Sequence, residues 1–311
     1  MPRRPRVLVV YKKDAYQLYV QEEQDPRLLQ LLRRADPDAL DVRRAHDVHE
    51  EAMAAIVQAL RRLGVELELA HRVGLKVTKR YHLVVSVGGD GTFLHAARSI
   101  RRIPILGVNS DPTRSEAVFC AATPRTVTRL CRLALQGRLP QLRLYRLHLT
   151  LNGTRLPQSA LNDVLVVHDH PATMSRYRLR IGGREELQKS SGVWVATAAG
   201  SSSAVLAAGG VQLPWSARRF QYQPRELYRG RLSRPRLTGG VVKPPAAVRV
   251  TWLMRRGSAF LDGPHVQIPL RFGDRLDISL SAHDPLRVLR APSNTHGPGR
   301  FAQGRVVRTT T

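Results

Sequence analysis

His82-Leu-Val-Val-Ser-Val-Gly-Gly-Asp-Gly-Thr92 begins as an apolar run and ends in a cluster of glycines around one aspartate. The apolar run predicts a buried strand over 82–87, and residues 93–100 predict a helix after the glycines. A strand, a glycine turn and a helix in this order occur where open α/β sheets bind ligands. Glycines let backbone N–H groups approach phosphate oxygens, and the helix N-terminus adds a partial positive charge. The segment therefore predicts a phosphate site at the edge of an α/β sheet.

The residues around this segment alternate between strand-like and helix-like patterns. Apolar residues at helical spacing predict a helix over 46–63, which Gly64 would end. Further strands are predicted at residues 6–10, 65–70 and 104–108. Strands that alternate with helices indicate a doubly wound, largely parallel sheet. We therefore expect residues 1–122 to form an α/β domain that carries the glycine turn.

After residue 122 the pattern changes to short β-rich segments separated by Gly, Pro and Asn turns. This pattern predicts a mainly β domain over 123–290. Residues 291–311 are basic and rich in Pro, Gly, Ser and Thr, so we expect a disordered tail. The predicted fold class is α/β, with an N-terminal doubly wound α/β domain followed by a mainly β C-terminal domain. Strands of the second domain are predicted at residues 143–151, 163–167, 175–181, 193–197, 247–253, 260–261 and 276–280.

Composition is that of a globular protein with an unusually strong positive charge. Of 311 residues, 42% are hydrophobic, and the formal net charge is +26. Only Cys120 and Cys131 are present, which excludes a disulfide framework. The basic residues are 44 Arg and 6 Lys, a ratio that resembles genome-wide codon bias more than a surface selected to follow a phosphate backbone. We therefore expect no specific nucleic-acid partner, although a basic surface would attract small polyanions.

The sequence shows neither a secretory signal nor a membrane-spanning pattern. The apolar run 7–10 ends at charged residues and is too short for a signal peptide. The uncharged stretch 190–217 holds four glycines, six serines and Pro214, which make it too polar and too interrupted for a lipid-facing helix. We expect a cytoplasmic protein without membrane association, and a homodimer.

The aspartate inside the glycine cluster, Asp90, is the first candidate for catalysis. A carboxylate beside phosphates is repelled unless it takes a proton from a hydroxyl or helps to hold a cation. The turn is not the Gly-x-Gly-x-x-Gly fingerprint of dinucleotide-binding folds, and it lacks the Gly-Lys pair of a Walker loop. The structural alternative is an ordinary Asp-Gly turn. A strand before the turn and a helix after it favour the functional interpretation.

Several segments together resemble the NAD kinase family, in the order in which the family carries them. Gly88-Gly-Asp-Gly-Thr92 is similar to the signature of the superfamily that joins NAD kinases to diacylglycerol-type and sphingosine-type lipid kinases. Ala160-Leu-Asn-Asp-Val164 resembles the Leu-Asn-Glu-Val motif of NAD kinases, and residues 196–203 resemble their Thr-Pro-Thr-Gly-Ser loop. Gly107-Val-Asn-Ser-Asp-Pro-Thr-Arg-Ser-Glu116 and Gln188-Lys-Ser-Ser-Gly192 are most similar to the mitochondrial type. The resemblance covers about residues 6–290.

The resemblance implies an ATP-dependent kinase that phosphorylates the 2′-hydroxyl of the adenosine ribose of NAD, with Mg²⁺ or another divalent cation. Asp90 would be the general base, and no metal-ligating side chain is predicted. Asp262, in an Asp-Gly turn, is interpreted as structural. The residues that would contact the two nucleotides are Gly88, Gly89, Gly91, Thr92, Asn162, Asp163, Lys189, Thr197, Gly200, Ser201 and Ser202.

Some of these positions depart from the family pattern or have a purely structural alternative. Ala198 and Ala199 replace Pro and Thr of the loop, and Asp163 is one methylene shorter than Glu. These changes concern NAD contacts more than phosphoryl transfer. Lys189 could be an exposed turn lysine, and the serines that follow Gly200 could cap a helix.

Three rival functions remain at this point. A lipid kinase of the same superfamily and a non-catalytic nucleotide-binding regulator are the first two, and a nucleic-acid-binding protein rests on charge alone. The sequence also leaves open ATP or polyphosphate as the donor, and whether NADH is accepted.

Overall fold

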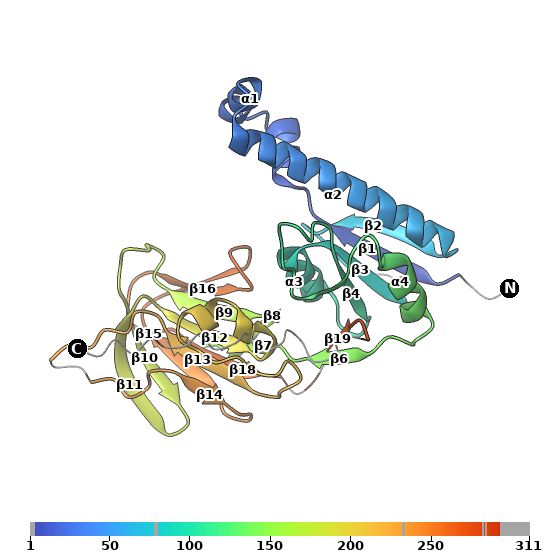
Figure 1. Cartoon of the computed structure of the whole chain (residues 1–311). Helices are drawn as coiled ribbons and strands as arrows, with labels where there is room; N and C mark the ends of the chain where they lie inside the picture. Colours follow the sequence, from blue (N-terminus) through green and yellow to red (C-terminus); the bar gives the residue numbers. More distant parts are fainter. Residues whose placement is uncertain (1–3, 78–79, 232–233, 282, 284, 293–311) are drawn as a thin grey trace, which may run out of the picture.

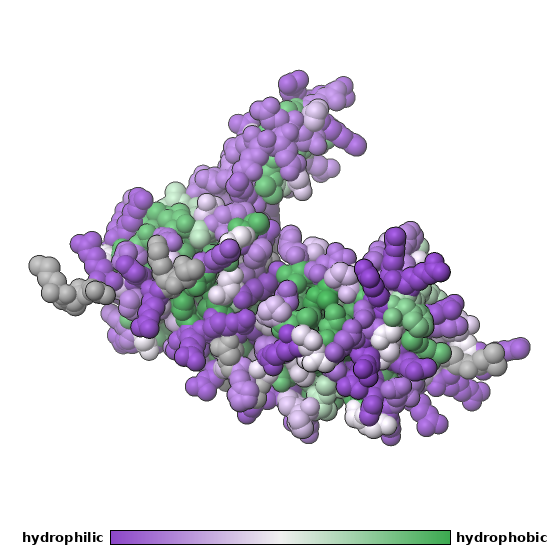
Figure 2. Space-filling model, turned by 180° about the vertical axis from the view of Figure 1, so that it is seen from behind, coloured by the Kyte–Doolittle hydropathy of each residue, from purple (hydrophilic) through white to green (hydrophobic). Residues whose placement is uncertain are grey.

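The computed structural model describes residues 4–77, 80–231, 234–281, 283 and 285–292. An α/β body and a β body lie side by side, and a helical arm projects from the α/β body (Figure 1). Seen from behind, the arm has a largely hydrophilic surface (Figure 2). None of the helices in these ranges is both long and apolar enough to span a bilayer.

A seven-stranded sheet forms the α/β body. It comprises β1 (Arg6–Tyr11), β2 (Glu66–His71), β3 (Leu83–Gly88), β4 (Ile105–Asn109), β5 (Cys120–Ala122), β6 (Gln141–Leu144) and β19 (Leu286–Leu289). The order is β2-β1-β3-β4-β19-β6, with β5 paired to β4. All pairs are parallel except that of β6 with β19. Every residue of β3 is buried, as expected for a parallel strand covered on both faces.

Helices cover both faces of this sheet. They are α2 (Pro37–Arg62), α3 (Asp90–Ser99) and α4 (Val127–Leu135). On one face Ile56 of α2 and Leu130 of α4 share a core with Val85 of β3. On the other face Phe93 of α3 packs with Val84 of β3. The predicted doubly wound α/β arrangement is confirmed.

The arm consists of a π-helix (Tyr16–Glu22), α1 (Pro26–Arg33) and the first turns of α2. The predicted helix over 46–63 is therefore too short at its start. Asp36 caps α2 by accepting from the backbone N–H groups of Asp38 (3.1 Å) and Ala39 (3.2 Å). An Asp cap followed by Pro37 is a favourable helix start. Apolar periodicity could not reveal it, because these first turns bury little.

The β body is a sandwich of two antiparallel, six-stranded sheets. Leu149, Tyr177 and Trp252 of one sheet share a core with Val164 and Val195 of the other. The first sheet has the order β11 (Arg184–Ser190), β10 (Ser175–Ile181), β15 (Val248–Trp252), β18 (Arg275–Leu280), β7 (Leu147–Leu151) and β8 (Thr154–Ala160). The second has the order β14 (Gly240–Val242), β13 (Phe220–Pro224), β12 (Val193–Thr197), β9 (Asp163–Val167), β16 (Gly257–Leu261) and β17 (Gln267–Leu270).

The chain crosses between the two bodies twice. The predicted strand over 143–151 is in fact two strands in different sheets, β6 and β7, because the chain leaves the first sheet at Tyr145 and Arg146. Arg146 is buried and donates to the carbonyl oxygens of Ala97 (3.1 Å) and Ile100 (2.8 Å) at the end of α3. The returning segment lies beside it, since the N–H of Ser281 donates to the Arg146 carbonyl (2.9 Å).

The observed sheets can be compared with the domain boundaries that the sequence predicted at residues 122 and 290. Helix α4 and strands β6 and β19 belong to the α/β body although they follow residue 122, so the change of sheet does not coincide with that residue. As domain boundaries, residues 122 and 290 stay predictions. The expected disordered tail falls almost wholly on residues 293–311, which lie outside the described ranges.

Candidate active site

The glycine turn joins the end of β3 to the start of α3. Gly88 has φ +141°, and a Cβ there would lie 2.7 Å from the Thr92 hydroxyl oxygen, so only glycine fits. Thr92 is buried beneath the turn, whereas Gly89 is partly buried and Gly91 is exposed. The accessible part of the turn is therefore backbone at a helix N-terminus, which is suited to phosphate oxygens.

The carboxylate of Asp90, the first residue of α3, is fixed by two backbone N–H groups. Phe119 donates to Oδ1 (2.8 Å) and Val118 to Oδ2 (3.0 Å). Burial raises the pKa of Asp90, while these two N–H groups and the charge of Arg290 oppose the rise. A carboxylate held in one orientation with a raised pKa is a stronger base than an exposed aspartate.

Asn162 and Asp163 form a turn into β9 that is held by the carboxylate of Asp262. This carboxylate accepts from the N–H groups of Leu161 (2.9 Å), Asn162 (2.7 Å) and Asp163 (3.2 Å). Arg98 of α3 donates to the carbonyl oxygens of Leu261 (2.8 Å) and Asp262 (2.7 Å). The expected structural role of Asp262 is confirmed. Helix α3, which begins at Asp90, thus also anchors this turn.

The side chain of Asp163 faces a small hydrogen-bonded cluster. Its Oδ2 accepts from Asn162 Nδ2 (2.9 Å) and from the Ser203 hydroxyl (3.2 Å). Only 5% of Asp163 is exposed, and burial together with the nearby charge of Asp262 raises its pKa to about 7.

The loop 197–203 is fastened to this turn from the other side. Thr197 donates to the Leu161 carbonyl (2.7 Å) and accepts from the N–H of Gly200 (3.0 Å). A Cβ on Gly200 would lie 2.1 Å from the Asn162 carbonyl oxygen, so the two backbones need glycine here. The Ser201 hydroxyl is fully buried and donates to the Ala198 carbonyl (2.7 Å), whereas Ser202 is half-buried.

One apolar core brings these segments together. Phe93 of α3, Phe119, Leu161, Ala199 and Trp215 belong to a single buried cluster on the α3 face of the sheet. The glycine turn, the peptides that hold Asp90, the Asn162–Asp163 turn and the 197–203 loop therefore meet where the two bodies join.

Comparison with known proteins identifies the family to which this chain belongs. Residues 6–132 match the family model of the ATP-NAD kinase N-terminal domain. A probable NADH kinase of Oryza sativa subsp. japonica is 39% identical over 234 residues, which cover 68% of this chain and 71% of that protein. The chain belongs to the NAD kinase family. The mitochondrial NAD kinase 2 of Homo sapiens is 28% identical over 254 residues, 65% of this chain and 57% of that protein.

A solved structure shows the same fold. The crystal structure of an NAD kinase from Archaeoglobus fulgidus in complex with ATP has a TM-score of 0.65 and 22% identity, and it covers 93% of this chain and 94% of that one. The family resemblance, the fold class and the kinase activity expected from the sequence are confirmed. The cytoplasmic location and the homodimer stay predictions.

Lys189 lies apart from the other predicted site residues of this NAD kinase family member. It is exposed on β11, an edge strand, and its ammonium nitrogen lies 6.0 Å from the centre of the Tyr228 ring. In the described part of the chain, no hydrogen bond or ion pair joins it to another predicted site residue. Its contact with a nucleotide stays a prediction.

A cavity of about 300 Å³ opens beside the glycine turn and shows residues that the sequence patterns did not single out. Gly89 lines it together with Lys12, Asp14, Asp111 and Arg114. Two of these residues lie in the Gly107–Glu116 segment, so the resemblance of that segment was an available signal. Lys12 follows β1 directly, and only its place at the carboxyl edge of a parallel strand could have suggested it.

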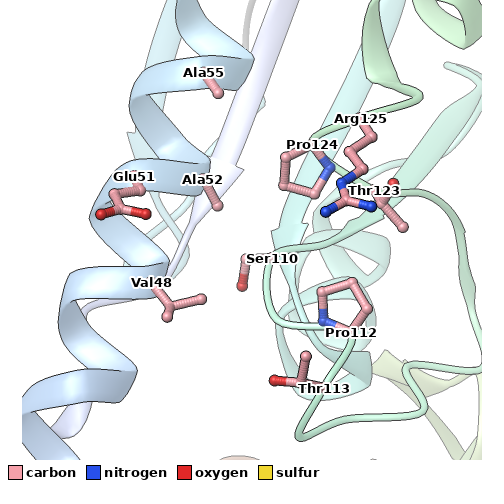
Figure 3. Close-up of a pocket in the computed structure, with 10 residues that line it drawn as sticks. All are labelled: Val48, Glu51, Ala52, Ala55, Ser110, Pro112, Thr113, Thr123, Pro124 and Arg125. Atoms are coloured by element: carbon pink, nitrogen blue, oxygen red, sulfur yellow. The ribbon is translucent and has the colours of Figure 1, made fainter.

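A larger cavity, of about 700 Å³, lies between α2 and the two loops that face it. Ala52 and Ala55 of α2 form one wall, and Pro112, Thr113 and Pro124 form the other (Figure 3). Its walls contain none of the predicted site residues. The site described above is therefore not the largest cavity of the described chain.

Proposed function

We propose that this chain transfers the γ-phosphate of ATP to the 2′-hydroxyl of the adenosine ribose of NAD, with Asp90 as the general base. The observation that carries the proposal is the carboxylate of Asp90. It is fixed by the N–H groups of Val118 and Phe119, and it lies at the N-terminus of α3 beside the cavity that Gly89 lines together with Lys12, Asp14, Asp111 and Arg114. A base there can take the proton of the attacking hydroxyl as the phosphate is transferred.

The donor phosphates fit the cavity at the start of α3. Lys12 and Arg114 supply positive charge, and the N–H groups of the glycine turn point from a helix N-terminus. Phosphoryl transfer depends mainly on positioning and charge neutralisation. The two cations would neutralise phosphate charge, and the backbone N–H groups would position the phosphates.

The same cavity suits a phosphate-bound Mg²⁺. Mg²⁺ prefers oxygen ligands and is commonly held by one or two carboxylates together with substrate phosphates. Asp111 and Asp14 both line the cavity and supply such oxygens, so these two residues would hold the ion. When bound, Mg²⁺ would offset the negative charge of the transferred phosphate.

The acceptor ribose is assigned to Asn162 and Asp163. An ionised Asp163 can accept from ribose hydroxyls, and the amide of Asn162 can donate or accept. Their neighbour Leu161 shares the apolar core of Phe93 on α3, so the turn that carries them lies where the two bodies join. The ribose would therefore reach Asp90 from the side of the β body.

Two choices of substrate are left within this proposal. The Oryza relative is named as a probable NADH kinase, so NADH is a candidate acceptor beside NAD. Polyphosphate is a candidate donor beside ATP. The lipid kinase and regulator alternatives are not favoured by the family comparisons. A homodimer and a cytoplasmic location are parts of the proposal that rest on sequence alone.

The deciding experiment is Asp90→Asn, assayed for NADP formation. Removing a general base lowers turnover by roughly 10²- to 10⁴-fold. Binding of ATP and of NAD, measured by calorimetry, should stay close to that of the parent because the fold is kept. Asp38→Asn is the matched control, since Asp38 also lies in the first turn of a helix but is exposed on the arm. Turnover of Asp90→Asn within a few-fold of the parent would refute the assignment of the base.

A further inference from the structure

Arg290 directly follows β19 and is one of the most deeply buried residues of the chain, with 1% of its surface exposed. Strand β19 runs parallel to β4, which is itself parallel to β3. The end of β19 therefore lies at the same edge of the sheet as the glycine turn after β3. A buried arginine requires partners that compensate for its lost hydration.

The guanidinium of Arg290 is held against the segment that fixes Asp90. Its Nη1 donates to the carbonyl oxygen of Val118 (3.1 Å), and its charge lies over the ring of Trp215 at 4.9 Å from the ring centre. The backbone N–H of Arg290 donates to the Pro140 carbonyl (3.0 Å), which fixes the residue at the end of its strand.

A single peptide group connects Arg290 to the base. The carbonyl of Val118, which accepts from Arg290, and the N–H of Phe119, which donates to Asp90, belong to the same peptide unit. Its two dipolar ends point in opposite directions, so each bond orients and polarises the other. Removal of the Arg290 bond would free this peptide to tilt, and the Asp90 carboxylate would tilt with it.

Aromatic packing reinforces this line of contacts. The Phe119 ring stacks on Phe93 of α3 at 5.1 Å between centres, and Trp215 lies 5.0 Å from Phe119 on another side. Trp215 is also the ring over which Arg290 lies. Arg290 therefore supports the 118–119 peptide through its carbonyl and through the neighbouring rings.

Arg290 also acts on the pKa of Asp90, together with the other charged and titratable groups around that carboxylate. Arg290 lowers the pKa of Asp90, and Glu116 raises it. The third neighbour, Cys120, is kept as a neutral thiol because burial raises its pKa. Arg290 is therefore the nearby cation whose loss would push the pKa of Asp90 upward.

We propose that Arg290 is a positioning residue for phosphoryl transfer, which fixes the Val118–Phe119 peptide and thereby the orientation of the Asp90 carboxylate. This inference rests on the proposed function, because it assumes that Asp90 is the base.

The test compares Arg290→Gln and Arg290→Lys with the parent, with kcat and the KM for NAD measured from pH 5.5 to 9. Arg290→Gln loses the charge, so the acid limb of the kcat profile should move to higher pH. Its kcat should fall by about tenfold or more, since misplacing a reacting group by about 1 Å costs on the order of 10²-fold. Arg290→Lys keeps the charge, so its acid limb should stay in place and its kcat should recover in part. The KM for NAD should change little in both.

Several outcomes would overturn the proposal. It fails if both variants fold, by circular dichroism, and match the parent in kcat and acid limb. It also fails if kcat falls equally at every pH in both, because a merely structural defect would do that. If Arg290→Gln does not fold, Arg290→Lys alone decides: a reduced kcat with a parent-like melting temperature and an unchanged KM for NAD supports the role, and parent kinetics or a kcat loss that tracks a lowered melting temperature exclude it.

Two controls distinguish a failure of the positioning role of Arg290 from a failure of the proposed role of Asp90 as the base. Arg143→Gln, on the neighbouring strand β6, removes an exposed arginine and should leave the kinetics unchanged. Asp90→Asn is measured alongside. If it retains turnover, the assignment of the base fails; if it is inactive while both Arg290 variants behave like the parent, only the positioning role fails.

Discussion

Asp163→Asn should stabilise the protein above neutral pH while it weakens NAD binding. The parent carboxylate is 5% exposed and lies beside Asp262, and its pKa is raised from an ordinary 3.8 to about 7. Between about pH 4 and pH 7 the unfolded chain has lost this proton while the folded chain keeps it. Folding stability contributed by Asp163 therefore falls as pH rises through this window and levels off above it.

The size of the effect follows from the pKa. Each tenfold change in proton affinity corresponds to about 1.4 kcal/mol, so the ionised Asp163 costs the folded state a few kcal/mol. The amide side chain of the variant carries no charge at any pH, and its carbonyl can still accept from Ser203. The variant's margin over the parent in Tm should vanish below about pH 4, be small near pH 5 and reach several degrees near pH 8, since 1 kcal/mol is worth roughly 2–4 °C in chains of 150–250 residues.

Although Asp163→Asn should stabilise the fold, it should weaken NAD binding. Losing a hydrogen bond to a charged group costs about 1.5–3 kcal/mol, which corresponds to a rise of roughly 10- to 150-fold in the KM for NAD. The maximal rate should be largely kept, because bonds to the ribose exist before and during the reaction. In the parent, the KM for NAD should itself rise as the pH falls below about 7 and Asp163 gains its proton.

The assays are thermal denaturation at pH 5 and pH 8 and steady-state kinetics with ATP saturating. Asp38→Asn, which changes an exposed aspartate on the arm, is the control for a general charge effect. An equal Tm difference at both pH values would show that Asp163 does not titrate with a raised pKa. An unchanged KM for NAD with a raised KM for ATP would place Asp163 on the donor side and refute the site assignment.

Two further predictions concern packing and charge. Gly200→Ala should destabilise the fold by about 1–3 kcal/mol and raise the KM for NAD, because its Cβ would lie 2.1 Å from the Asn162 carbonyl oxygen. The control is Gly183→Ala, whose Cβ would meet no atom within 4 Å; thermal melts and kinetics should show its stability and its KM for NAD unchanged. Duplex DNA should bind weakly and without sequence preference, and fluorescence anisotropy should show the binding largely lost near physiological salt. A sequence-selective complex at that salt would mean that the Arg-rich surface has a nucleic-acid partner.

Strands β1, β3 and β4 of the α/β body could be predicted because each is a continuous apolar run, and β2 because its apolar and acidic residues alternate. Strand β19, which lies between β4 and β6, could not. It is four residues long, and its partners β4 and β6 precede it by well over a hundred residues, so no local pattern links them. The charged strand β11 escaped prediction for another reason. It is an edge strand, where exposed charges replace the apolar alternation that marks a buried strand.

Site residues could be predicted where they belong to a short sequence motif. They could not be predicted where their role depends on contacts with residues distant in sequence. The glycine turn and the Asn162–Asp163 turn are both local, and both lie where the two bodies join. Arg290 was only the last residue of the predicted β domain, with no role assigned to it, because one buried arginine is indistinguishable among 44 in the sequence. Its partners Val118, Trp215 and Pro140 are all far from it in sequence.

The pairing of Asp163 with Asp262 shows what the fold adds to the motif. Both carboxylates are buried, but Asp262 receives three backbone N–H bonds and the nearby Arg98, whereas Asp163 receives only two side-chain bonds. Asp262 is therefore committed to structure, and the proposed site leaves Asp163 as the carboxylate that would accept from ribose hydroxyls. Arg98 lies on the same helix that begins with Asp90. Because a helix is rigid, α3 sets the separation between the proposed base and the proposed acceptor site without depending on a mobile loop.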